Sequence, residues 1–169
     1  GNYNRAVNQR NNLLKQIGTR KELSDTVSVW DMKLTEYGGG IIKARKKLVE
    51  ELNELLPEIN SKLSGGRDKL SVKYEPNVSE TDFGTKLAMN FERDLFLKAT
   101  GNGPHRDDIS FYVGDKNLKL YGSQGQQRTA ALALKLAEIE LVRSKIKESP
   151  ILLLDDVLSE LDRKRQKQL

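Results

Sequence analysis

Residues 122–128 have the composition of a loop that could bind an anion. They read Gly-Ser-Gln-Gly-Gln-Gln-Arg and open a dense helical run from 123 to about 147. Ser123 and Gln126 have the spacing of a capping box, in which each side chain bonds the backbone amide of the other. Capping does not require Gly125, and a glycine lets a backbone approach another molecule closely. Two interpretations stay open: a well-capped helix, or one whose terminal amides and hydroxyl also bind a phosphate. We call residues 122–128 the Ser123 loop.

A second candidate follows this helix at residues 151–156, which read Ile-Leu-Leu-Leu-Asp-Asp after Pro150. A continuous apolar run is typical of a strand buried on both faces of a parallel sheet, and ligands bind at the carboxyl ends of such strands. Asp155 could then hold a divalent cation beside a phosphate, and Asp156 could orient or deprotonate a water. Taken alone, the pair fits a structural turn better. Its position one helix length after the Ser123 loop favours the functional interpretation.

Composition and charge exclude several classes of protein. The chain has 169 residues, 37% hydrophobic and 31% charged, and it contains no cysteine. Disulfides and thiolate metal sites are therefore excluded. No run approaches the ~20 apolar residues of a membrane span, and residues 1–21 lack the apolar core of a secretory signal. We expect a globular protein of the cytoplasm.

The net charge of +5 is concentrated at one end of the chain. Residues 1–21 contain no acidic side chain, whereas the remainder has equal numbers of acidic and basic ones. This segment could contact the backbone of DNA, or it could be a solubilising helix face. Its five basic residues are Arg5, Arg10, Lys15, Arg20 and Lys21.

The hydrophobic pattern predicts a helical first part. Residues 4–17 read as a helix ended by Gly18, and from Leu23 to Leu63 apolar residues recur in alternating steps of three and four. This seam predicts a long helical arm, with a bend where the glycines 38–40 and Pro57 weaken the helix. Trp30 and Tyr37 fall on the seam, which favours core packing over base stacking. A strand at 70–74 and a third helix carrying Phe83, Leu87, Phe91 and Leu95 complete this part.

A strong turn signal at residues 100–104 predicts a domain boundary. Beyond it we expect a strand at 109–113, a turn at Gly114 and Asp115, and a partner strand at 118–121. The expected fold class is α+β: antiparallel helices of an arm at residues 1–102, followed at 103–169 by a lobe with a few strands and one long helix whose start could bind a phosphate. Residues 159–162, Ser-Glu-Leu-Asp, read by themselves as the start of another helix.

In their order and spacing, the three segments resemble the signature loop, the Walker B strand and the D-loop of ABC-type ATPase heads. The match narrows with residues 103–108 (Gly-Pro-His-Arg-Asp-Asp), 121–129 and 153–162, which are similar to the RecF family of bacterial recombination mediators. The resemblance is specific in residues 103–162. In residues 1–102 it is architectural, because RecF proteins also carry a helical arm before these motifs.

The resemblance implies an ATP-dependent, DNA-binding protein of repair and replication that dimerises head to head, with ATP between the phosphate loop of one subunit and the signature loop of the other. It implies partners RecO and RecR and action at junctions of single- and double-stranded DNA. The residues implied to contact the nucleotide of the other subunit are Ser123, Gln124, Gly125, Gln126 and Arg128.

The same resemblance assigns roles to six further residues. Asp155 would bind Mg²⁺, and Asp156 would be the catalytic base, where many ABC ATPases have a longer glutamate. Ser159 and Asp162 would lie at the dimer interface. His105 and Arg106 would support the nucleotide or that interface, although a single histidine beside an arginine is more often a structural hydrogen-bonding residue.

One departure from the family pattern limits these roles. No G-x-x-x-x-G-K-[ST] phosphate loop occurs in the sequence. We therefore interpret the chain as a fragment that neither binds ATP tightly nor hydrolyses it alone, while the intact protein would be a weak ATPase that uses ATP and Mg²⁺. Two alternatives remain: an SMC-like structural head, and a helical interaction module without nucleotide chemistry.

Overall fold

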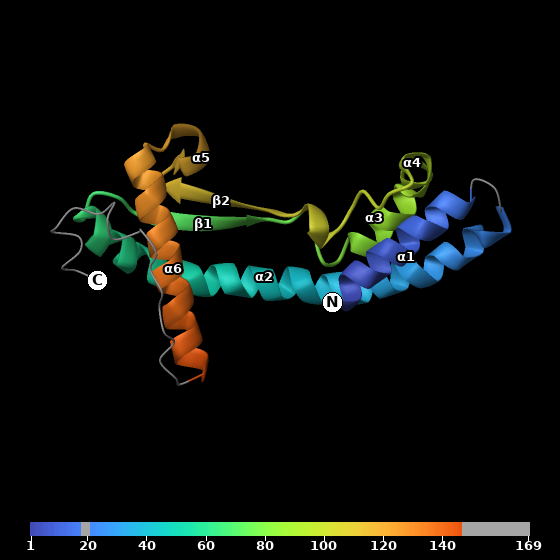
Figure 1. Cartoon of the computed structure of the whole chain (residues 1–169), viewed down its shortest axis with the longest axis horizontal. Helices are drawn as coiled ribbons and strands as arrows, with labels where there is room; N and C mark the ends of the chain where they lie inside the picture. The colour runs from blue at the N-terminus through green and yellow to red at the C-terminus, as the bar shows by residue number, and fades with distance from the viewer. Residues whose placement is uncertain (18–20, 147–169) are drawn as a thin grey trace. The chain divides into compact units, whose positions relative to one another are not determined.

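The computed structural model describes residues 1–17 and 21–146 (Figure 1). The α+β class is confirmed, with helices predominating and one small sheet. The described residues divide into two compact units, the first comprising residues 1–17, 21–46 and 74–108 and the second residues 47–73 and 109–146. The second unit thus takes up residues 47–73, which the sequence assigned to the arm. The division into an arm and an ATPase lobe stays a prediction.

Helices form the first unit. α1 (Asn2–Ile17) and the first part of α2 (Val27–Ser64) run antiparallel, joined through the 3-10 helix η1 (Lys21–Thr26) (Figure 1). The short helices α3 (Phe83–Met89) and α4 (Phe91–Leu97) complete the unit. Trp30 and Tyr37 pack against its core, as predicted. The buried residues of that core are Tyr3, Ala6, Leu34, Ile42, Val78, Phe83 and Leu87.

A buried arginine ties these helices together. Arg10 of α1 is fully buried, and its Nε lies 2.6 Å from Asp31 Oδ1 on α2. Its Nη1 lies 2.7 Å from Asp94 Oδ2 on α4 and donates to the Thr100 hydroxyl at 3.1 Å. Because a buried charge needs paired and hydrogen-bonded partners, this network fixes where α4 and residue 100 lie against the first two helices.

The long helix departs from the predicted seam near its middle, whereas Leu52 and Leu63, further along the seam, are buried. Val27 and Leu34 are buried as expected, but Leu48 is 45% exposed and Val49 is buried instead. An α-helix has 3.6 residues per turn, so its buried stripe drifts away from a strict seven-residue repeat. The helix continues through Gly38–Gly40 and Pro57 without interruption; the bend stays a prediction.

The sheet belongs largely to the second unit. Its strand order is β1 (Leu70–Glu75), β2 (Asp108–Val113), β3 (Lys116–Asn117), with β2 and β3 antiparallel and Val113 opposite Lys116. β1 is an edge strand, and Asn53 of α2 pairs with that edge. The side-chain amide of Asn53 donates to Val72 O and accepts from Val72 N, both at 2.8 Å.

Two predicted elements were wrong. Residues 118–121 form a short helix, α5 (Leu118–Tyr121), in place of a strand, because Asn117 Oδ1 accepts from the amides of Lys119 and Leu120 and caps a helix there. The third helix is broken into α3 and α4 at Asn90, whose side chain donates to Lys86 O at 2.8 Å. A side-chain amide that bonds the preceding turn competes with the regular helical pattern.

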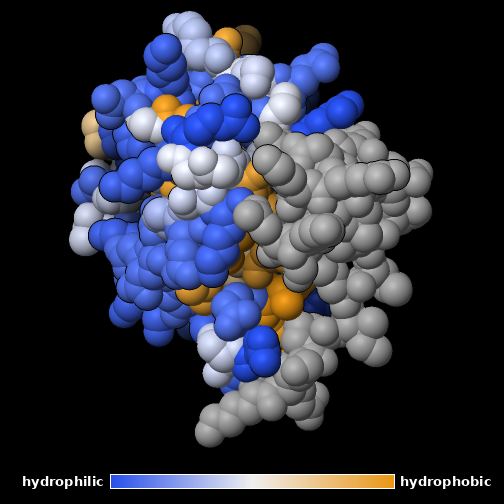
Figure 2. All heavy atoms as spheres, turned by 90° about the vertical axis from the view of Figure 1, so that its left-hand side faces the viewer, coloured by the Kyte–Doolittle hydropathy of each residue, from blue (hydrophilic) through white to orange (hydrophobic). Residues whose placement is uncertain are grey.

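α6 (Gln124–Ile146) is the long helix of the second unit, as expected. The face that it buries carries Thr129, Ala130, Leu132, Ala133 and Ala137. The side of the molecule turned to the viewer in Figure 2 is mainly hydrophilic, with hydrophobic residues showing between the polar ones. Within residues 1–17 and 21–146, no helix has an apolar stretch sufficient to cross a bilayer.

Two glycines of α2 provide a matched test of the first unit's packing. A Cβ at Gly38 would lie 2.4 Å from Phe83 Cε1, whereas one at Gly40 would meet nothing within 4 Å. We expect Gly38→Ala to destabilise the protein by about 1–3 kcal/mol through overpacking. Gly40→Ala should stabilise it by about 0.5–1 kcal/mol through helix propensity. Urea denaturation measures both, and equal effects at the two positions would contradict this packing.

Candidate functional site

The capping box at the start of α6 is confirmed. Ser123 Oγ accepts from the amide of Gln126 at 3.2 Å, and Gln126 Oε1 accepts from the amide of Ser123 at 3.0 Å. The connection before it is held by Gln127, whose side-chain nitrogen donates to Leu118 O at 3.2 Å. The helix therefore begins at a defined residue, with Ser123 as its cap.

The first amides of α6 remain available to a ligand. In the described part of the chain, the amides of Gln124 and Gly125 have no protein acceptor, as expected for the first turn of a helix. Ser123, Gln124 and Gly125 are all exposed. The Ser123 hydroxyl accepts one bond and can still donate its own hydrogen. A Cβ at Gly125 would have no neighbour closer than Ser123 Oγ at 4.0 Å, so the backbone is open to close approach.

The Ser123 loop borders a cavity of about 390 Å³ whose other wall comes from residues 64–68. Arg67 and Asp68 lie there, after the end of α2, and Gln126 Nε2 donates to Asp68 Oδ1 at 3.1 Å. Exposed amides, a hydroxyl and a guanidinium at one cavity fit the oxygens of a phosphate group. This wall was not predicted from the sequence, because 58 residues separate Asp68 from Gln126.

Of the remaining predicted site residues in the second part of the chain, the structure describes only Arg128. Arg128 is exposed on the second turn of α6. Asp155, Asp156, Ser159 and Asp162 lie outside the described residues, so their proposed places are not tested. Among the residues that the structure describes, no three acidic, histidine or cysteine side chains come together as metal ligands.

His105 and Arg106 lie in the first unit, in the 3-10 turn η2 (Pro104–Arg106), whereas the Ser123 loop belongs to the second. His105 Nε2 lies 3.0 Å from Thr100 O and Nδ1 lies 2.8 Å from the Tyr3 hydroxyl. A carbonyl can only accept, so Nε2 donates to it and Nδ1 accepts from Tyr3. This arrangement supports the structural interpretation of His105.

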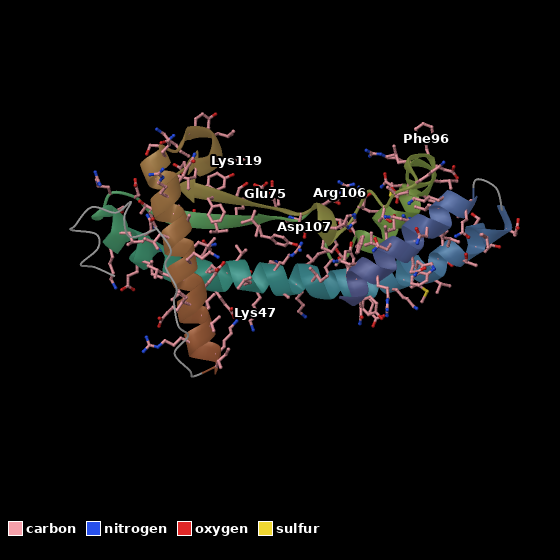
Figure 3. The ribbon with its side chains drawn as sticks, viewed as in Figure 1. Lys47, Glu75, Phe96, Arg106, Asp107 and Lys119 are labelled. Atoms are coloured by element: carbon pink, nitrogen blue, oxygen red, sulfur yellow. The ribbon has the colours of Figure 1, made fainter. Side chains whose placement is uncertain are left out.

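Asp107, which is not among the predicted site residues, anchors this turn. Its carboxylate is 2% exposed, pairs with Arg45 of α2 at 2.8 Å, and accepts from the amide of Asn77 at 2.9 Å and from the Tyr74 hydroxyl. Figure 3 shows Asp107 directed toward α2 and Arg106 directed away from it. Burial, with the hydrogen bond to Asp107, raises the pKa of Tyr74 to about 12.

The basic residues near the N-terminus do not form one surface. Arg5 and Lys15 are exposed, but Arg10 is buried and holds two carboxylates. Its prediction as a DNA contact was wrong, because a sequence pattern of charge does not reveal which cation is enclosed by the fold. Arg20 and the side chain of Lys21 lie outside the described residues.

Sequence comparison finds close relatives. The chain is 57% identical over 168 residues to the DNA replication and repair protein RecF of Lachnoclostridium phytofermentans and 54% identical over 167 residues to that of Agathobacter rectalis. RecF of Bacillus mycoides is 43% identical over 178 residues. These matches cover 99% of the chain but only 46–48% of the relatives, so the chain spans about half their length. No protein-family model matches it.

The fold agrees with these relatives. A solved structure of the recombination mediator protein RecF with ATP, described as part of the RecFOR pathway, superposes with a TM-score of 0.89 at 36% identity. It is matched over 98% of this chain and 47% of its own length. A second RecF structure, with ATPrS, gives a TM-score of 0.86. The resemblance to RecF proteins is confirmed: the chain is RecF-like in sequence and in fold.

The Tyr74–Asp107 bond gives a prediction with a defined pH dependence. Tyr74→Phe removes a donor from a buried carboxylate and should destabilise the protein by about 1–3 kcal/mol at neutral pH. The folded protein holds the Tyr74 proton above the ordinary pKa of about 10, so this stabilisation is present below that pH and is lost as the pH rises toward 12.

The difference between the two proteins should therefore narrow from pH 10 upward, measured by urea denaturation at several pH values. Tyr121→Phe is the control, because Tyr121 is 73% exposed and its substitution should change little. A difference that widens with pH would contradict the assignment.

Proposed function

We propose that this chain, which matches RecF proteins over about half their length, is part of an ATP-dependent, DNA-binding mediator of recombination that acts in DNA repair and replication. The observation that carries the proposal is the start of α6. The Gln126 side chain bonds the Ser123 amide and the Asp68 carboxylate and so fixes the loop. Ser123, Gln124 and Gly125 stay exposed. Amides of this kind are free at the start of every helix, but here Ser123 and Gly125 lie at a cavity that Arg67 also lines, and this combination suits an anion.

In this proposal the exposed donors bind the γ-phosphate of ATP held by a second copy of the protein. The Ser123 hydroxyl and the amides of Gln124 and Gly125 would donate to its oxygens, and the positive end of the α6 dipole favours the charge. Arg128, on the next turn, would add a cation at the edge of the site. The bound ATP supplies the charged group that joins two copies.

The rest of the assignment follows the resemblance and stays part of the proposal. Asp155 would hold Mg²⁺, Asp156 would act as a slow catalytic base, and Ser159 and Asp162 would lie where two copies meet. DNA, RecO and RecR would be the partners of the intact protein. Arg5 and Lys15 are exposed cations that could contact DNA phosphates.

Two substitutions in the full-length protein test this function. Ser123→Ala removes a donor to a charged oxygen, worth about 1.5–3 kcal/mol for each bond. With two such sites in a dimer, ATP-dependent association should weaken by about a hundredfold or more. Gly125→Ala adds a methyl group to open space and should keep or raise thermal stability, yet it should also weaken association by blocking close approach of a phosphate.

Sedimentation velocity with a non-hydrolysable ATP analogue measures the association. Ser144→Ala is the matched control, since Ser144 lies near the other end of the same helix and its hydroxyl donates to Leu141 O. Association of both variants at the level of the unmodified protein would exclude the proposed contact and favour a helical interaction module.

A further inference from the structure

We infer that Asp68 is a positioning residue for nucleotide-dependent association, acting through Gln126. This inference rests on the proposed function of the Ser123 loop and adds a residue from another part of the second unit. Its basis is the hydrogen bond of 3.1 Å from Gln126 Nε2 to Asp68 Oδ1, at the cavity that both residues line.

Chemistry fixes the orientation of the Gln126 amide. The Ser123 amide is a donor and requires the oxygen of Gln126, while the Asp68 carboxylate accepts and requires the nitrogen. Rotating the amide by 180° would break both bonds. Asp68 therefore selects the rotamer in which Gln126 also completes the capping box, so it controls where the Ser123 loop lies.

Asp68 is itself held firmly by the end of α2. Its amide donates to Ser64 Oγ at 3.3 Å, and its carbonyl accepts from Asn60 Nδ2 at 2.8 Å. Both Asn60 and Ser64 are buried side chains of α2. Arg67 Nε donates to Ser64 O at 2.9 Å, which closes the turn. These hydrogen bonds hold the turn that carries Asp68, so its carboxylate stays within reach of Gln126.

The charge of Asp68 argues that its role is to position Gln126. A carboxylate beside a phosphate site repels the ligand, and a loop built only to attract an anion would omit it. Arg67, its neighbour on the same cavity, offsets part of this repulsion. Asp68 is therefore best explained by the hydrogen bond that its oxygen accepts from Gln126 Nε2.

Two substitutions of Asp68 should therefore give opposite results. Asp68→Ala leaves Gln126 without its acceptor and should weaken ATP-dependent association of the full-length protein about tenfold. Asp68→Asn keeps an acceptor oxygen and removes the negative charge, so association should equal or exceed that of the unmodified protein. ATP binding by the isolated monomer should stay unchanged in both, because the inferred role concerns only the Ser123 loop.

The coupling to Gln126 is tested by a double-mutant cycle. Asp68→Ala should add nothing in a Gln126→Ala background, since the two residues act through one bond. Asp115→Ala is the control: Asp115 is an exposed carboxylate in the β2–β3 turn of the same unit. Association is measured by sedimentation with a non-hydrolysable ATP analogue, and thermal denaturation confirms that each variant is folded.

The inference is overturned if Asp68→Ala associates normally while Ser123→Ala does not, if Asp68→Asn weakens association as much as Asp68→Ala, or if Asp68→Ala and Gln126→Ala are additive. An unchanged Ser123→Ala variant would instead overturn the proposed function, and this inference with it. The two failures are therefore distinguishable.

Discussion

Gln126 connects two segments of the second unit that lie 58 residues apart in the sequence, the start of α6 and the turn at Asp68. Its side-chain oxygen holds the Ser123 amide, its side-chain nitrogen holds Asp68, and its backbone amide completes the cap of α6. These bonds fix the direction of the helix start. The hydroxyl of Ser123 and the amides of Gln124 and Gly125 take no part as donors in these bonds. They remain available to a ligand.

The first unit is ordered by a different device, buried charge. Arg10 joins two carboxylates from separate helices, and Asp107 collects a guanidinium, a phenol and an amide around one carboxylate. Breaking a buried pair leaves an uncompensated charge, which costs much more than the pair itself contributes. Such networks define one arrangement of the helices, and they explain why residues of strongly polar type lie in this core.

Sequence patterns predicted the features that depend on neighbours along the chain. The Ser123–Gln126 box, the helices at 4–17 and 123–147 and the packing of Trp30 follow from spacing within a few turns. The α5 helix was not predicted, because residues 118–121 have a strand-like pattern and the cap formed by Asn117 lies just before them. The burial of Arg10 and the bond from Gln126 to Asp68 depend on contacts 84 and 58 residues apart, which a single sequence does not reveal.

A structure of the full-length protein bound to a non-hydrolysable ATP analogue would test the central claim most directly. We predict two copies joined through nucleotide, with a γ-phosphate oxygen within about 2.5–3.0 Å of Ser123 Oγ from the opposite copy. A γ-phosphate surrounded by residues of one copy alone, with the start of α6 facing solvent, would contradict it.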